Sequence, residues 1–185
     1  MDTNTLATAR YSRGAIALHW IIAALIVLNF TLAWVAEELP DEQRYALIGN
    51  HKAIGIIVLL LTVLRIVWRL THKPPPLVET LKAWEAALSK VTHVLIYGLM
   101  LAIPLAGWGY SSAYGKGKPV SIFGLFDFPA LPVASDKPTV GMFGELHEIT
   151  TTIMLVLLAL HLGAALKHHF IDKDGTVRRM VPWLK

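Results

Sequence analysis

Four long apolar segments dominate the hydropathy pattern of this chain. They cover residues 15–36, 51–70, 91–110 and 146–170. The hydrocarbon core of a bilayer is about 30 Å thick, and about 20 helical residues rising about 1.5 Å each cross it. Each segment is therefore long enough to span a membrane. The pattern predicts an all-α, integral membrane four-helix bundle, in which residues 1–185 form a single domain.

The amino-acid composition agrees with a membrane protein and excludes several other classes of protein. Hydrophobic residues make up 55% of the chain and charged residues 16%, too little charge to cover a soluble domain of 185 residues. This excludes soluble, disordered and nucleic-acid-binding proteins. The chain has no cysteine, which excludes disulfides, thiolate metal sites and iron–sulfur clusters.

Lysine and arginine residues are unevenly divided between the two sides of the predicted membrane. With the N-terminus inside, twelve of the 17 fall on the inner side and five on the outer side. Cytoplasmic loops of membrane proteins carry such an excess of positive charge. The bias predicts a multi-pass protein surrounded by lipid, with both termini in the cytoplasm.

The connection between the third and fourth segments, residues 111–145, is unusually long. It is rich in Gly and Pro, and its centre at residues 121–132 is apolar and aromatic. A loop of this length is usually functional or disordered. Because its centre is apolar, we expect it to pack over the mouth of the bundle.

Histidines inside the apolar segments are the candidate functional residues. Ionisable side chains at membrane depth usually face the bundle interior and have a partner there. His147, His161 and His168 fall on one stripe of the fourth segment, because spacings of 14 and 7 residues are close to whole helical turns. By depth, His51 matches His147 and His19 matches His161. Each pair comes from two helices, as a haem clamped between two imidazoles requires, so the spacing favours two stacked haems.

Two other uses of the histidines stay open. Zinc needs three or four converging ligands, and Glu145 and Glu148 beside His147 keep such a site open at the outer mouth. A stripe of histidines could also pass protons along the helix. The corresponding alternative function is a haem-free metal or proton transporter lined by histidines. Neither alternative explains why the histidines occur as pairs at matching depths.

Short motifs surround each of these histidines. They are Ala17-Leu-His19-Trp20, Gly49-Asn-His51-Lys-Ala-Ile-Gly55, Arg65-Ile-Val-Trp-Arg69 before Pro74-Pro-Pro76, His93-Val-Leu-Ile-Tyr97, Leu146-His147-Glu148 and His161-Leu-Gly-Ala-Ala-Leu-Lys-His168-His169. Over nearly the whole chain, the sequence resembles the bacterial cytochrome b561 family of four-helix, dihaem inner-membrane proteins. The resemblance implies two haems b, with His19 and His161 as axial ligands of one and His51 and His147 of the other.

The resemblance also implies electron transfer within the bacterial inner membrane. The best-described member of this family oxidises superoxide at the periplasmic face and passes electrons to ubiquinone, whereas other relatives resemble electron conduits that serve partner proteins. Our hypothesis is a cytochrome that takes electrons from a periplasmic donor, with superoxide as the leading candidate, and reduces ubiquinone. As an enzyme it would be a superoxide:ubiquinone oxidoreductase. The alternative is an electron-transfer subunit that serves a separate redox partner protein.

Charged residues near the outer face are candidates for attracting superoxide. Superoxide is a small anion, and a basic mouth raises the encounter rate of an anion. The candidate residues are Lys52, Lys116, Lys118 and Lys137.

At the inner face, charged residues and histidines that are not predicted haem ligands are candidates for two roles. Arg65 and Arg69 lie four residues apart on one helix face, so they are candidates for pairing with haem propionates or for snorkelling to the membrane surface. A quinone site needs a hydrogen-bond donor and a proton source. The candidates for it are His93, Lys167 and His168.

Overall fold

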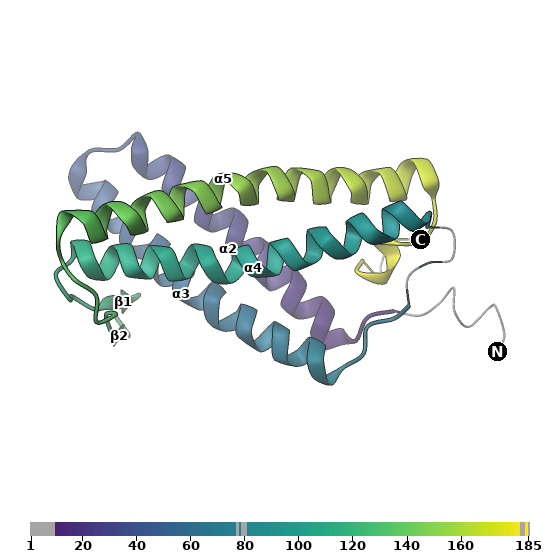
Figure 1. Ribbon diagram of the computed structural model, residues 1–185, viewed down its shortest axis with the longest axis horizontal. Helices are drawn as coiled ribbons and strands as arrows, with labels where there is room; N and C mark the ends of the chain where they lie inside the picture. Colours follow the sequence, from purple (N-terminus) through teal and green to yellow (C-terminus); the bar gives the residue numbers. More distant parts are fainter. Residues whose placement is uncertain (1–9, 77, 79–80, 182–183, 185) are drawn as a thin grey trace.

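Four long helices make up most of the molecule (Figure 1). The computed structural model describes residues 10–76, 78, 81–181 and 184. The helices are α2 (Arg13–Glu37), α3 (Asp41–Thr71), α4 (Ala83–Tyr114) and α5 (Lys137–Lys167). All four are long and apolar enough to cross a membrane, which confirms the predicted all-α bundle.

Four short elements complete the described chain. They are the strands β1 (Val120–Ile122) and β2 (Phe126–Phe128), the π-helix η1 (His168–Asp172) and the 3₁₀-helix η2 (Val177–Arg179). The strands form an antiparallel hairpin, and η1 and η2 follow α5.

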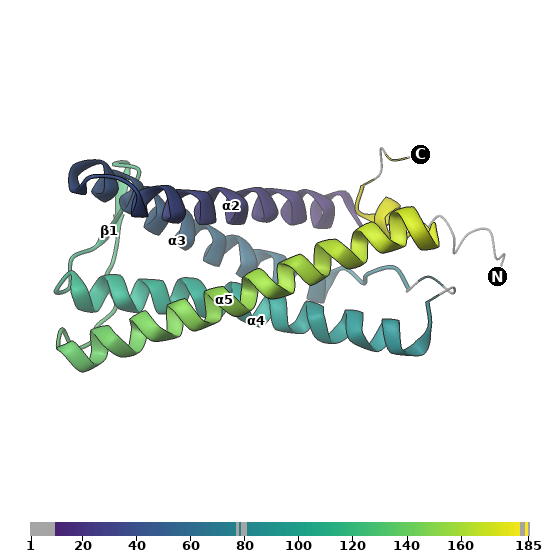
Figure 2. The ribbon, with the colours of Figure 1, turned by 90° about the horizontal axis from the view of Figure 1, so that it is seen from above.

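The helices are arranged as two antiparallel pairs. Helix α2 packs against α3, α4 packs against α5, and contacts between α3 and α4 join the pairs (Figure 2). The start of α2 and the end of α5 lie at one end of the bundle, called the termini end. The hairpin lies near the opposite end, called the hairpin end (Figures 1 and 2).

Apolar side chains are divided between a narrow core and a broad outer surface. One buried cluster takes residues from all four helices, namely Ile22, Ile54, Val58, Met100 and Met154. Many other apolar residues point outward, and Val27, Val94 and Leu160 are each more than 60% exposed. Lipid replaces water around such a surface, so the pattern fits a membrane-embedded bundle.

Three helices extend well beyond the apolar segments of the sequence. Helix α3 begins at Asp41 and α4 at Ala83, both ahead of the apolar residues that mark the spans. Helix α5 begins at Lys137, where the side chain of Asp136 accepts a hydrogen bond from the Thr139 amide at 2.9 Å. This N-cap satisfies an amide that the helix itself leaves unpaired. The long connection is correspondingly shorter than the sequence suggests.

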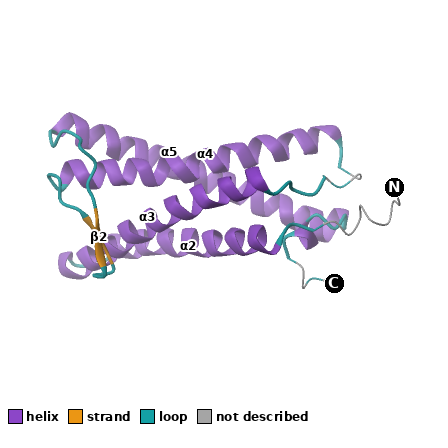
Figure 3. Cartoon of the chain, turned by 90° about the horizontal axis from the view of Figure 1, so that it is seen from below, coloured by secondary structure: helices purple, strands orange, loops and turns teal. Residues whose placement is uncertain are grey.

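The centre of that connection forms the hairpin and does not lie over the end of the bundle. Val120 and Ile122 of β1 form a buried cluster with Ala53 and Ile56 of α3. The indole of Trp108 on α4 donates a hydrogen bond to the Pro129 carbonyl at 2.9 Å. The hairpin therefore lies against the flank of the bundle, between α3 and α4 (Figures 1 and 3).

Candidate functional site

One pair of facing histidines lies toward the hairpin end. His51 is on α3 and His147 is on α5, and their ring centres are 6.2 Å apart with the ring planes at 83°. A backbone carbonyl accepts a hydrogen bond from Nδ1 of each ring. The Nδ1 of His51 donates to the Asn29 carbonyl at 3.1 Å, and the Nδ1 of His147 donates to the Ile103 carbonyl at 2.9 Å. A carbonyl only accepts, so the lone pair of each neutral ring is left on Nε2.

Close approach of α4 supports the position of the His147 ring. Gly107 has no side chain, and a Cβ there would lie 3.0 Å from Cε1 of His147 and 3.1 Å from its Nδ1. A larger residue would push the ring away from Ile103, whose carbonyl accepts its hydrogen bond. Gly107 is thus a site residue that sequence reasoning missed, because only the packing of α4 on α5 shows its role.

A second pair lies toward the termini end. His19 is on α2 and His161 is on α5, and their ring centres are 6.4 Å apart with the ring planes at 68°. The two pairs stand at different depths, because His147 and His161 are 14 residues apart on the same helix, about 21 Å along its axis.

The spacing within each pair fits a metal held between the two rings. Two imidazole nitrogens bound on opposite sides of one metal, at about 2 Å each, place the ring centres roughly 6 Å apart. The measured distances of 6.2 and 6.4 Å agree with this value. Each pair lies between helices of different pairs in the bundle, as a flat macrocycle requires. The residues present therefore fit an iron porphyrin at both positions.

The His19 ring has a different partner from the rings of the other pair. Nη1 of Arg65 donates to Nδ1 of His19 at 3.1 Å, and Nε of Arg65 donates to the Tyr97 hydroxyl at 2.9 Å. The Tyr97 ring also lies 5.6 Å from the guanidinium of Arg65 and 5.9 Å from that of Arg69. Sequence reasoning assigned no role to Tyr97, although its place one turn after His93 puts both residues on one face of α4.

Both arginines line a basic pocket at the termini end. Its other lining residues are Tyr11, Ser12, Ala15, Trp68, His72, Lys73, Pro74, Tyr97 and Met180. None of the lining residues is acidic, so the pocket suits a carboxylate or another anion. Trp68 closes one side, where its ring stacks on His72 at 4.2 Å and its indole donates to Ser12 at 3.0 Å.

The structure brings His93 to the second pair rather than leaving it apart. Its ring centre is 5.4 Å from that of His161, at 88°. Its Nδ1 donates to the Ser89 carbonyl at 2.6 Å, which leaves the lone pair on Nε2. His93 therefore adjoins the same site as His19 and His161.

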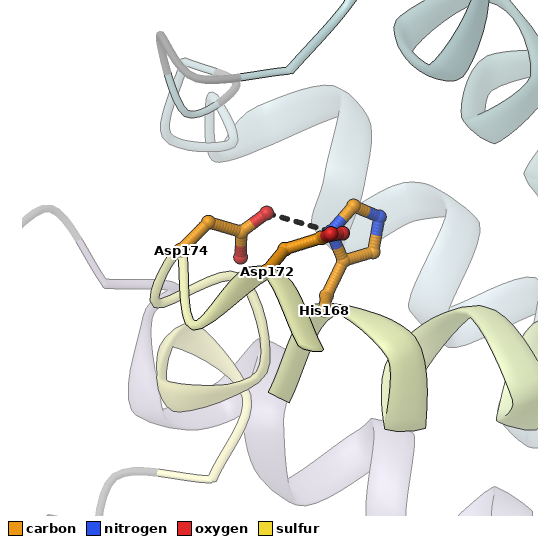
Figure 4. A group of neighbouring side chains, drawn as sticks. All are labelled: His168, Asp172 and Asp174. Carbon is orange, nitrogen blue, oxygen red and sulfur yellow. Dashed lines mark hydrogen bonds and ion pairs between the residues drawn. The ribbon is translucent and has the colours of Figure 1, made fainter. Parts of the chain in front are cut away.

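His168 and two aspartates form a compact group where α5 ends (Figure 4). The Nδ1 of His168 lies 2.6 Å from Oδ2 of Asp174 and 3.1 Å from Oδ2 of Asp172. Burial raises the pKa of Asp174, but hydrogen bonds from Thr176 and His168 outweigh it, and the pKa lies below its ordinary value. The carboxylate of Asp174 is thus held charged beside the imidazole.

Lys167 is engaged in ion pairs beside this group. Its ammonium lies 2.9 Å from Glu85 and 2.5 Å from Asp172, so it joins the start of α4 to the turn after α5. Across the described ranges, His168, Asp172 and Asp174 are the group whose ligand atoms come close enough to hold a metal ion. Glu145 and Glu148 do not form such a group with His147, so the predicted zinc alternative at the outer mouth finds no support.

The four lysines proposed for anion steering all lie toward the hairpin end. Lys116 and Lys118 follow α4, Lys137 is the first residue of α5, and Lys52 lies on α3 next to His51. Lys116, Lys118 and Lys137 are exposed, while Lys52 is half-buried.

Comparison with known proteins identifies relatives over almost the full chain. The chain is 35% identical to cytochrome b561 homolog 2 of Escherichia coli over 181 residues, which covers 97% of this chain and 94% of the relative. It is 29% identical to cytochrome b561 homolog 1 of the same organism over 175 residues, covering 94% and 97%. It is also 29% identical over 179 residues to a Yersinia pestis protein named probable superoxide oxidase CybB, covering 94% and 96%.

A family model described as prokaryotic cytochrome b561 matches residues 10–183. This match includes all four long helices and both histidine pairs. Together with the four spanning helices it indicates a multi-pass inner-membrane protein with b-type haem that takes part in electron transfer. The chain belongs to the prokaryotic cytochrome b561 family.

Proposed function

We propose that this chain binds two haems b and carries electrons from a periplasmic donor to ubiquinone. The observation that carries the proposal is the pair of imidazole separations, 6.2 and 6.4 Å, at two depths in the bundle. His51 with His147 and His19 with His161 would be the axial ligands. Haem supplies one-electron transfer, and two imidazoles per iron leave no open coordination position, which favours outer-sphere transfer over oxygen binding.

The protein's own residues would hold and orient the two groups. Backbone carbonyls of Asn29 and Ile103 fix the rings of His51 and His147 with Nε2 directed away from them. At the other pair, Arg65 and Arg69 would neutralise propionate carboxylates in the basic pocket that they line. Tyr97 keeps the two guanidinium groups together there.

Ubiquinone reduction requires protons at the termini end. His168 suits proton delivery, because the carboxylates of Asp172 and Asp174 hold its Nδ1 and leave Nε2 for a quinone oxygen. His93 adjoins His161 and is the second candidate. Lys167 already pairs with two carboxylates, so we assign it a positioning role at the edge of this site.

Superoxide is the donor that we favour. One relative is named a probable superoxide oxidase, and the lysines toward the hairpin end would attract an anion. For this, the hairpin end must face the periplasm and both termini the cytoplasm, as the distribution of Lys and Arg predicts. Electrons would then enter at the pair formed by His51 and His147.

A spectroscopic experiment on the purified protein tests this function. The reduced-minus-oxidised spectrum and the haem-to-protein ratio are measured first, and low-spin b-type bands at two haems per chain are expected. A superoxide-generating system is then added, with superoxide dismutase as the control. Prompt reduction that the dismutase abolishes supports superoxide as the donor.

The lysines supply a matched pair of variants for the same assay. Replacing Lys52, Lys116, Lys118 and Lys137 by Gln should slow reduction by superoxide about tenfold or more at low salt, and added salt should shrink the difference. The control variant replaces Lys82, Lys90, Lys173 and Arg178, which lie at the termini end outside the basic pocket, and should react at the parent rate. If superoxide fails to reduce a dihaem protein, the donor is a separate redox partner protein and the chain is its electron-transfer subunit.

A further inference from the structure

The hairpin displays an apolar tip that the electron-transfer function does not use. Val120 and Ile122 of β1 are buried against α3, only 5% and 4% exposed. At the turn, Phe123 is 49% exposed, Leu125 82% and Phe126 58%. These three residues form the hairpin tip. Large apolar side chains gathered on one protrusion mark a contact surface, because each of them costs free energy in water.

The tip is held in place by the fold. Its turn uses Phe123 at φ 52° and Gly124 at φ 75°, the left-handed conformations of a tight hairpin, and the Leu125 amide donates to the Ile122 carbonyl at 2.9 Å. The base of the hairpin is fixed by the Trp108–Pro129 hydrogen bond of 2.9 Å. The exposure of the tip is therefore built into a paired, anchored structure.

The hairpin lies level with the edge of the apolar span. Its buried face packs on Ala53 and Ile56, which begin the apolar run of α3 just after Lys52. Helix α3 continues ten residues beyond His51 to Asp41, about 15 Å farther from the membrane centre. The hairpin thus stands beside the helices and not beyond their ends (Figure 1).

The polar residues of the hairpin lie on a different side from its tip. Ser121 pairs with Asp127 in the ladder, and both are exposed, on the strand face opposite Val120 and Ile122. A hairpin with an apolar tip and a charged outer face fits the boundary between lipid headgroups and acyl chains. It does not fit the hydrocarbon core, where Asp127 would lack water.

We propose that the hairpin tip inserts into the interfacial layer of the leaflet at the hairpin end and contacts phospholipid acyl chains there. Lipid is the favoured partner because the hairpin packs against the flank of α3 and α4, and both helices carry exposed apolar residues such as Leu60 and Leu105. The ladder and the turn hydrogen bond pair the backbone groups that lie between the two strands, which lowers the cost of partial removal from water. The proposal depends only on the membrane location and not on the haems or the donor.

Site-specific labelling tests the proposal, because the chain has no native cysteine. Leu125→Cys carries a single fluorophore, and the protein is reconstituted in phosphatidylcholine vesicles with or without brominated acyl chains. We expect brominated lipid to quench the label and aqueous iodide to leave it unchanged. Ser135→Cys, in the exposed segment before α5, is the matched control and should show the reverse. The haem spectrum of each variant verifies that it is folded.

Two results would overturn the proposal. Quenching of the Leu125→Cys label by iodide, with none by brominated lipid, would place the tip in water. Efficient disulfide-linked dimers of unlabelled Leu125→Cys under oxidation, with no dimers of Ser135→Cys, would identify a second copy of the chain as the partner. Phe126→Cys repeats both measurements at a second position of the tip.

Discussion

At the scale of single residues, the two histidine pairs are separate sites with separate supports. Removing one imidazole should therefore release one haem and leave the other bound. We expect His161→Ala to bind about one haem per chain and His147→Ala likewise. The remaining absorption bands should differ, because backbone carbonyls hold the rings of one pair and Arg65 contacts the other pair. The haem-to-protein ratio and a low-temperature spectrum measure this.

The matched control is His169→Ala, because the His169 ring contacts Phe170 and belongs neither to a pair nor to the basic pocket. It should retain both haems. A His161→Ala protein that still binds two haems would show that the pairing is wrong, with His93 at 5.4 Å as the first substitute ligand to examine.

The hydrogen bond from Arg65 to Nδ1 of His19 is incompatible with iron binding by the same ring through Nε2. An arginine only donates, so its hydrogen bond to Nδ1 of His19 places the proton of the neutral ring on Nε2. An imidazole that binds iron through Nε2 must carry its proton on Nδ1 instead, where an arginine cannot accept it. We infer that Arg65 leaves His19 when haem binds and pairs instead with a propionate in the basic pocket.

The prediction for Arg65→Gln follows from the loss of this positive charge. A nearby cation favours the reduced iron, so the midpoint potential of one haem should fall by about 60 mV, which is a tenfold change in a one-electron equilibrium. The other midpoint should stay constant. Spectroelectrochemical titration measures both, with the exposed Arg178→Gln as the control. Equal shifts of the two midpoints would rule out a local role for Arg65.

At the scale of elements, the turn after α5 is stabilised by charge. Asp174 accepts from His168 at 2.6 Å and from the Thr176 amide at 2.9 Å, and these bonds favour its ionised form. A carboxyl with a lowered folded-state pKa contributes stability above its unfolded pKa of about 4, and this contribution disappears as the pH falls through the folded value. The turn should therefore loosen on acidification.

Asp174→Asn tests this contribution. In detergent at pH 7 the variant should unfold a few degrees below the parent, as a loss of about 1 kcal/mol produces in a chain of this size. Below about pH 4 the difference should shrink, because Asp174 of the parent then takes up a proton and loses the same charge. Thermal unfolding followed by circular dichroism across this pH range measures it. A difference that grows toward acid would contradict the assignment of the charged form.

The elements also show where sequence reasoning reaches its limit. Apolar length predicts α2 to α5, since about 20 apolar residues in a row have few alternatives to a spanning helix. The hairpin gives no comparable signal, because its strands have three residues each and its turn contains Phe123 and Gly124 in place of the usual Asn-Gly. Its position on the flank depends on Trp108, which lies outside the hairpin in sequence.

At the scale of the whole molecule, depth is easier to predict than rotation about helix axes. Residue counting places His51 level with His147 and His19 level with His161, and the structure brings both sets of rings together. Counting says nothing about which helices turn their faces toward each other. The contact of His93 with His161 therefore becomes visible only when α4 and α5 pack.

The excess of Lys and Arg at the termini end predicts the orientation of the molecule in the membrane, and labelling in intact cells tests this prediction. Because the chain lacks cysteine, Lys116→Cys and Lys173→Cys each introduce a single thiol, one toward each end of the bundle. Translocating cytoplasmic positive charge is unfavourable, so a membrane-impermeant maleimide should label Lys116→Cys alone, whereas permeabilised cells should show both thiols labelled. The reverse pattern would place the four lysines of the hairpin end in the cytoplasm and would remove superoxide in the periplasm as the electron donor.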